Sequence, residues 1–125
     1  MNKNSYKLHI NKNSITTTHN SHTIAFLNFK YPNDSSNKRN LEIIYIYVNP
    51  KYRRQKIATN MINSLINTFS KKILYLSLWT SSQAETDKSW KLYKKLKFKQ
   101  LTYQPHYYSK NIGTRLFTKK FNINN

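Results

Sequence analysis

The segment 41–69 constrains the fold most strongly, because it joins an apolar strand to an amphipathic helix through a short basic turn. Residues 41–48 are β-branched or aromatic almost throughout, which is typical of a strand covered on both faces. Pro50 ends the strand, because proline cannot donate to a strand ladder and disfavours a helical neighbour. Apolar residues then recur at the helical positions Ile57, Met61, Ile62, Leu65, Ile66 and Phe69. The segment predicts a strand, a turn and a helix in succession.

The turn before this helix has the outline of a phosphate-binding site. The first N–H groups of a helix lack intrahelical partners, and the helix dipole adds partial positive charge there. Arg53, Arg54 and Lys56 increase that positive potential. These residues fit a solvated basic turn equally well, so both interpretations stay open on this segment alone.

Two motifs resemble those of a known family. Residues 53–58, Arg-Arg-Gln-Lys-Ile-Ala, are similar to the Arg/Gln-x-x-Gly-x-Gly/Ala signature of the GNAT superfamily, the general N-acetyltransferases that use acetyl-CoA. Arg53 and Ala58 match the signature, whereas Lys56 stands where the family has its central glycine. Residues 89–98 resemble the later family motif Ala-x-x-Leu-Tyr-x-x-x-Gly-Phe, with Lys97 at the glycine position. The motifs have the family's order and separation, so the chain is identified as a member.

The resemblance implies an α/β (α+β) fold: a mixed, twisted sheet with a central CoA-binding helix and a second, C-terminal helix. At 125 residues we expect one GNAT-like domain over 1–125, with 122–125 frayed. The sequence predicts antiparallel strands at 6–10, 15–18 and 23–31, and further strands at 73–79, 99–103 and 114–121, the last two around a turn at 104–108. The chain thus lacks the two helices that usually follow the family's first strand. Such a minimal member is expected to have an open substrate site.

Acetyl-CoA is the cofactor that the resemblance implies. Its expected binding residues are Tyr47, Val48, Arg53, Arg54, Gln55, Lys56, Ile57, Ala58 and Thr59. The backbone N–H of Val48 is the family's donor to the thioester carbonyl. At position 56 glycine normally lets the backbone approach the pyrophosphate, so Lys56 either obstructs that approach or adds an ammonium contact to phosphate. At position 97 the left-handed conformation expected after a helix costs a lysine about 1 kcal/mol.

Two catalytic residues are implied by the same resemblance. Tyr93 stands at the family's tyrosine, which in many members protonates the departing CoA sulfur; without the family pattern, a core aromatic on a helix face is the better interpretation. Glu42 lies eleven residues before Arg53, where histone-acetylating members have a glutamate that draws the amine proton through water. A solvent-facing or lysine-paired Glu42 is the open alternative. Simple alternation predicts that Glu42, Ile44, Ile46 and Val48 share one face of the strand.

The charge balance is extreme, with 22 lysine and arginine residues against 4 aspartate and glutamate residues, a net charge of +18. This surface indicates a nucleic acid or an acidic partner, since clustered positive charge raises affinity for polyanions. The composition also fits the bias of an AT-rich genome, because lysine, asparagine, isoleucine and tyrosine are abundant and Gly113 is the one glycine. Both explanations stay open.

Several classes of function are excluded or disfavoured. Cysteine is absent, which excludes disulfides, thiolate metal sites and a cysteine nucleophile. The four histidines lack ligand spacing, so no metal is expected. No apolar stretch has the length of a signal peptide core or a membrane span. We therefore expect a cytoplasmic or nuclear protein that is not secreted and has no membrane partner.

The predicted function is acetyl-CoA-dependent transfer of an acetyl group to a primary amine, on a protein lysine, a protein N-terminus or a small molecule. One alternative is an RNA-linked amine such as aminoacyl-tRNA, held by the basic surface. A second alternative is a non-catalytic, basic nucleic-acid-binding module on the same fold, which Lys56 favours.

Overall fold

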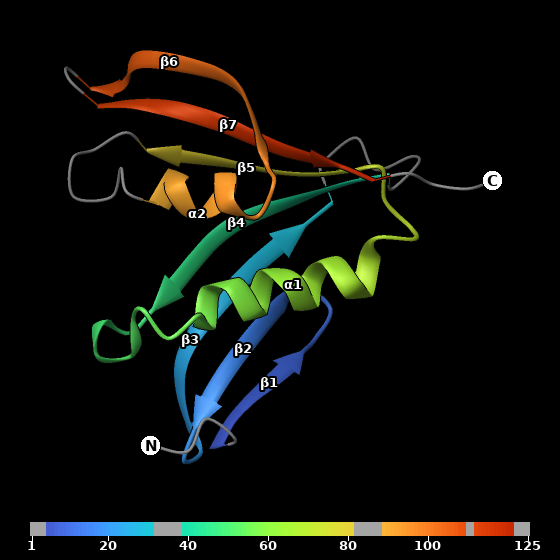
Figure 1. Cartoon of the computed structure of the whole chain (residues 1–125), viewed down its shortest axis with the longest axis vertical. Coiled ribbons are helices and arrows are strands. Elements are labelled where there is room, and N and C mark those ends of the chain that lie inside the picture. The colour runs from blue at the N-terminus through green and yellow to red at the C-terminus, as the bar shows by residue number, and fades with distance from the viewer. Residues whose placement is uncertain (1–4, 32–38, 82–88, 110–111, 122–125) are drawn as a thin grey trace.

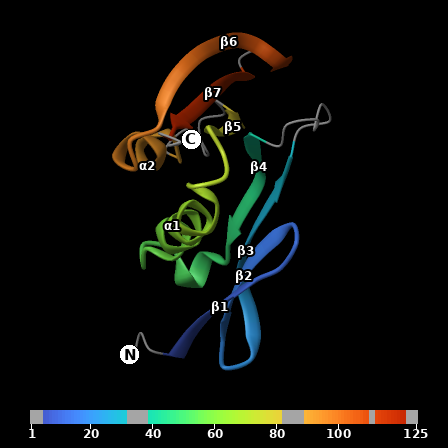
Figure 2. The same cartoon turned by 90° about the vertical axis from the view of Figure 1, so that its right-hand side faces the viewer.

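The computed structural model describes residues 5–31, 39–81, 89–109 and 112–121. These residues form a seven-stranded sheet of order β1-β2-β3-β4-β5-β7-β6. Two helices, α1 (Ile57–Phe69) and α2 (Ser89–Lys95), lie on the same side of it (Figures 1 and 2). The predicted mixed α/β fold is confirmed. Neither helix combines the length and the apolar character that crossing a membrane requires.

The N-terminal half is an antiparallel meander of β1 (Tyr6–Ile10), β2 (Ser14–His19), β3 (His22–Lys30) and β4 (Asn40–Val48). The first turn is organised by the side-chain oxygen of Asn11, which accepts the backbone N–H groups of Asn13 at 3.1 Å and Ser14 at 2.9 Å. The second turn is Asn20-Ser21, both with positive φ, as a tight hairpin requires. Because β2 follows β1 directly, no helix stands between them, as predicted.

The strands β4 and β5 (Tyr75–Ser81) are parallel neighbours, but they are paired only from Asn40 opposite Tyr75 to Ile43 opposite Leu78. Beyond this short ladder, β4 continues alongside β3 and β5 alongside β7 (Ile112–Lys120). The two halves of the sheet therefore separate at one end (Figure 1). The space between the unpaired ends of β4 and β5 is called the gap below.

A β-bulge in β4 corrects the predicted alternation. Asn28 pairs with Tyr45 and Phe29 with Ile43, which leaves Ile44 as the extra residue. Before the bulge Ile43 is buried under α1; after it, Ile46 and Val48 face the same core. Glu42, Tyr45 and Tyr47 consequently face the other way. The prediction that Glu42 shares a face with Ile46 and Val48 is wrong, because the bulge shifts the period by one residue.

The face opposite the two helices is called the open face below. Its side chains include Phe26, Tyr45 and Tyr47 on β3 and β4, and Ser77, Trp79 and Thr118 on β5 and β7. The described residues place no helix over it (Figure 2).

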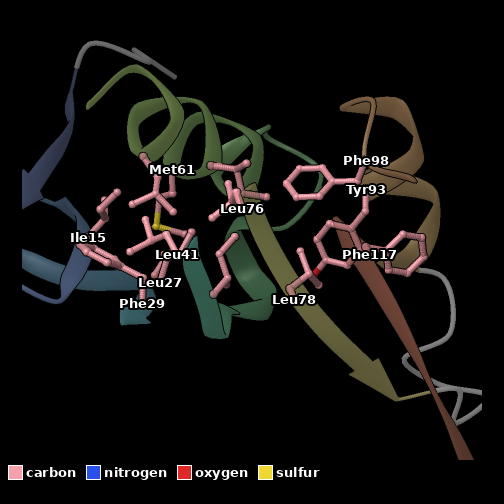
Figure 3. Packing of buried hydrophobic residues seen from close by; sticks show 14 of the residues in the cluster. Ile15, Leu27, Phe29, Leu41, Met61, Leu76, Leu78, Tyr93, Phe98 and Phe117 are labelled. Carbon is pink, nitrogen blue, oxygen red and sulfur yellow. The ribbon is translucent and has the colours of Figure 1, made fainter. Parts of the chain in front are cut away.

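The core lies between the sheet and the helices. From α1, the buried side chains are Ile57, Met61, Ile62 and Leu65, at the spacing that the sequence predicts. They pack on sheet residues such as Leu27 and Leu41, while Tyr93 of α2 extends the core toward Phe98 and Phe117 (Figure 3). Both helices are thus fixed to the sheet by apolar burial.

Several strand limits differ from the prediction, by one residue in β2, β3 and β4 and by two or more in β5, β6 and β7. The strand β5 begins at Tyr75 and extends to Ser81, rather than covering 73–79. The turn predicted at 104–108 is wrong, because β6 (Lys99–Ser109) continues through it. Since β6 is an edge strand, Pro105 needs no ladder partner on its outer side, and the register with β7 is irregular between Gln104 and Ser109. The expected frayed segment, 122–125, lies outside the described residues.

Candidate functional site

The turn before α1 is built by residues that take conformations unusual for their type. A short 3₁₀ helix (η2, Pro50–Tyr52) follows β4, capped by the side chain of Asn49, which accepts the N–H of Lys51 at 3.0 Å. Arg54 and Lys56 then have φ of 66° and 62°. Lys56, the residue preceding α1, is therefore left-handed, the conformation that glycine adopts without strain. A left-handed side-chain-bearing residue costs about 1–2 kcal/mol, which the surrounding contacts must offset.

Long-range contacts hold this strained turn. The hydroxyl of Tyr6 on β1 donates to the side-chain carbonyl of Gln55, which lies between the two left-handed residues. The rings of Tyr6, His19 and Tyr52 contact one another edge-on, with centroids 5.0 to 6.2 Å apart. The Nε of Arg53 donates to the carbonyl of Val48 at 3.0 Å. The first hairpin thus supports the turn on one side, through Tyr6 and His19. The end of β4 supports it on the other side, through the carbonyl of Val48.

A cavity of about 360 Å³ opens beside the turn. It is lined by Val48, Tyr52, Arg53, Arg54, Lys56, Ile57, Ala58, Thr59, Leu92 and Lys95. The first intrahelical hydrogen bond of α1 runs from the N–H of Asn60 to the carbonyl of Lys56, so the preceding N–H groups are available at the cavity. Four cationic side chains and a helix N-terminus make this cavity a strong anion site.

The end of β4 directs a backbone donor toward the gap between the sheet halves. Asn49 donates its N–H to the carbonyl of Ile24 on β3 at 2.8 Å. Because successive N–H groups of a strand point to opposite edges, the N–H of Val48 points toward β5. The ladder between β4 and β5 has ended before this point, at Ile43. A carbonyl oxygen in the gap can therefore accept this N–H.

This chain, with its basic turn beside a splayed strand pair, is similar to known proteins. The model of the acetyltransferase (GNAT) family matches residues 5–98, about three quarters of the chain. The chain belongs to this family. No curated protein matches the sequence significantly.

Solved structures with the GNAT fold superpose well at low sequence identity. The ribosomal-protein-S18-alanine N-acetyltransferase from Escherichia coli has a TM-score of 0.76 at 19% identity, over 99% of this chain and 74% of that chain. NAA60 from Arabidopsis thaliana, in complex with acetyl-CoA, has a TM-score of 0.71 at 17% identity, over 86% and 76%. Ard1 from Thermoplasma volcanium has a TM-score of 0.75 at 15% identity, over 88% and 71%. These likenesses establish the GNAT fold of the chain.

The predicted cofactor residues line the cavity, with two exceptions. Tyr47 has its side chain on the open face, in contact with Phe26. Gln55 is turned toward Tyr6. Three lining residues were not predicted from the sequence: Tyr52 of η2, and Leu92 and Lys95, which α2 adds to the cavity wall. The signal for the last two lies in α2. Their spacing of three residues places them on one helix face, a signal that would have found them once α2 was set beside the turn.

Tyr93 is only 7% exposed and does not line the cavity. Its ring centroid lies 6.1 Å from that of Phe98 and 5.5 Å from that of Phe117. In Figure 3 the side chain extends from α2 toward β5, with its hydroxyl end directed at Leu78, the last β5 residue paired with β4. The ring is a core aromatic whose hydroxyl points toward the base of the gap.

Glu42 is half-buried on the open face and lines a second cavity, of about 550 Å³. Its cross-strand neighbours are Lys30 on β3 and Ser77 on β5. Trp79 and Thr118 line the same cavity. Glu42 and the basic cavity therefore lie on opposite faces of the sheet, and the two cavities have no lining residue in common. Glu42 carries the one carboxylate side chain within the described ranges, since Asp34, Glu85 and Asp87 fall outside them.

Proposed function

We propose that the protein is an acetyl-CoA-dependent N-acetyltransferase whose acceptor is a primary amine. The basic cavity at the start of α1, which extends to Val48 at the end of β4 where the strand is no longer paired with β5, carries this proposal. In this cavity Lys56 takes the left-handed conformation that glycine adopts without strain, so its backbone is compatible with a glycine at this position of the signature. The structural neighbour NAA60, in complex with acetyl-CoA, supports the choice of cofactor.

Acetyl-CoA supplies an activated acetyl thioester. The side chains of Arg53, Arg54 and Lys56 would hold its phosphates, together with the first N–H groups of α1. The N–H of Val48 would donate to the carbonyl oxygen and stabilise the negative charge that develops there during amine attack. Leu92 offers an apolar wall.

Two side chains near the end of the β4–β5 ladder would transfer the protons of the reaction. Glu42 lies on the open face, one position before the ladder ends, and would take a proton from the attacking amine through water. Tyr93 approaches the gap from the helix side and would protonate the departing sulfur (Figure 3). This arrangement has the amine enter from the open face and the cofactor from the helix face. The absence of helices between β1 and β2 leaves the amine's path uncovered in the described part of the chain.

Thermal unfolding with and without acetyl-CoA tests the cofactor site. ATP and a short polyphosphate serve as controls, because a +18 protein binds any anion to some extent. A ligand at about 100 times its dissociation constant stabilises by about 2.7 kcal/mol, which corresponds to several degrees here. A shift with acetyl-CoA well above both controls supports the proposal. Equal shifts for all three anions reject it in favour of a non-catalytic basic module.

Release of free thiol from acetyl-CoA tests the transfer and the acceptor. Peptides with a free N-terminus, peptides with an internal lysine, small amines and aminoacyl-tRNA are compared as acceptors. Glu42→Gln is expected to lower the rate on protein or small amines about a hundredfold, the lower range for general base catalysis. Little loss on aminoacyl-tRNA would favour the RNA-linked acceptor instead.

A further inference from the structure

The open face carries a cluster of aromatic rings that the acetyl-transfer proposal does not use. The ring of Phe26 lies between those of Tyr45 and Tyr47, with centroid distances of 5.7 and 5.6 Å. Tyr45 is 54% exposed, whereas Ile43, on the other face of β4, is buried. Across the gap, Trp79 on the same face is 43% exposed. The open face thus presents several rings to solvent on both sides of the gap.

Cationic side chains surround these rings. Cross-strand partners share a face, which places Lys7, Lys30, Lys99 and Lys120 on the open face, opposite Thr18, Glu42, Thr118 and Tyr75 respectively. Glu42 is the one carboxylate side chain on this face among the described residues. Hydroxyl groups of Thr16 and Ser77 fill positions between the rings and the lysines. The face is therefore aromatic, hydroxylated and positive.

We propose that the open face binds single-stranded nucleic acid. Bases stack on exposed aromatic side chains of a sheet, and lysines around them neutralise the phosphates; the same combination of rings and positive charge serves single-strand recognition generally. The proposal goes beyond acetyl transfer and does not rest on it, because the binding requires no acetyl-CoA.

Other occupants fit the face less well. A second copy of the chain would bring another +18 surface against this one, which like-charge repulsion opposes. An acidic protein would satisfy the lysines but offers few flat groups for the rings. A membrane surface requires apolar side chains that insert between lipids, whereas these rings tilt against one another at 34° and 48° and lie among hydroxyl groups. Planar bases joined by phosphates match both features.

Fluorescence anisotropy with labelled single strands of about 12 nucleotides tests the proposal, a length within the site sizes of single-strand-binding folds. One RNA and one DNA of the same mixed sequence are compared with the corresponding duplex, at several salt concentrations and without acetyl-CoA. The wild-type protein should bind single strands more tightly than duplex. A preference between RNA and DNA identifies the source of the strand, and either result supports the proposal.

Substitutions at Tyr45 separate stacking from charge. Tyr45→Leu should weaken single-strand binding at least about fivefold with an unchanged salt dependence, because it removes a ring and no charge. Tyr45→Phe should bind like wild type, because stacking needs the ring and not the hydroxyl. Lys30→Gln should instead lower the salt slope by about 0.7, the value for one lost phosphate contact on a single strand.

The matched control is Tyr103→Leu. Tyr103 is 45% exposed but lies on the helix side of the sheet, with its ring 5.0 Å from the guanidinium of Arg115. All variants should unfold near the wild-type temperature. Equal losses for Tyr45→Leu and Tyr103→Leu, or tighter binding of duplex than of single strands, would overturn the proposal. Competition by polyglutamate as effective as by RNA, or a Tyr45 dependence seen only with anionic vesicles, would overturn it too.

Discussion

Tyr6 and Gln55 are joined by a side-chain hydrogen bond that connects the first strand to the middle of the basic turn, 49 residues later. On either side of Gln55 the backbone is left-handed, at Arg54 and Lys56. A glycine at position 56 would adopt the left-handed conformation without strain. This chain has no glycine in the turn, and the hydrogen bond from the distant Tyr6 helps to hold the turn in that conformation.

Tyr6→Phe is the substitution that tests this constraint. The loss of one hydrogen bond, about 1 kcal/mol, should raise the Kd for acetyl-CoA about fivefold, because the free turn then samples other conformations. Under saturating acetyl-CoA kcat should stay near wild type, since Tyr6 does not line the cavity. Isothermal titration calorimetry measures the Kd, and Tyr45→Phe is the control that removes a phenol hydroxyl elsewhere. An unchanged Kd in Tyr6→Phe would show that the cofactor site does not depend on the hydrogen bond from Tyr6 to Gln55.

Lys56→Gly and Lys56→Ala together separate conformation from charge. Both substitutions remove the ammonium, but only glycine removes the strain of the left-handed backbone. The free energy of unfolding should therefore be about 1 kcal/mol higher for Lys56→Gly than for Lys56→Ala. Tyr6→Phe should also cost less acetyl-CoA affinity in the Lys56→Gly background than in wild type. Urea denaturation and titration measure the two effects. Additive effects of Tyr6→Phe and Lys56→Gly on affinity would contradict the coupling.

Lys97→Gly should stabilise the protein by about 1 kcal/mol, a shift in Tm of roughly 4 °C. Lys97, two residues after the last residue of α2, has a φ of 71°. Its N–H donates to the carbonyl of Lys94 at 3.0 Å, and the N–H of Phe98 donates to the carbonyl of Tyr93 at 2.9 Å. This is the helix ending in which glycine is favoured. Lys97→Ala, which keeps the strain, should show no comparable gain in a thermal melt. Acetyl-CoA binding should not change, because Lys97 lies outside the cavity.

Tyr93→Phe distinguishes the two roles of this residue. The ring contacts with Phe98 and Phe117 remain in the variant, so the free energy of unfolding should fall by no more than about 1.5 kcal/mol, the net value of one hydrogen bond. If the hydroxyl is the proton donor, kcat should fall about a hundredfold with little change in the KM for acetyl-CoA. A wild-type kcat would leave Tyr93 as a core residue alone.

The sequence predicted the central elements because their patterns are local. The periodicity of 57–69 gave α1, and the motif positions of Lys56 and Lys97 identified the two places where the structure has left-handed lysines. The face of Glu42 was predicted wrongly, since a run as uniformly apolar as 41–48 contains no mark of the bulge at Ile44. The bond from Tyr6 to Gln55 was missed because no local pattern joins residues so far apart in the chain.

The short ladder between β4 and β5 divides the molecule into two mechanical halves. One half holds β1 to β4 and the other holds β5, β7 and β6; four paired positions and the packing of α1 join them. The basic cavity takes Val48 and Arg53 from the first half and Leu92 and Lys95 from the second. A cofactor bound in this cavity would contact both halves of the sheet. Its binding would therefore suppress separation of the two halves between β4 and β5, and its release would permit that motion.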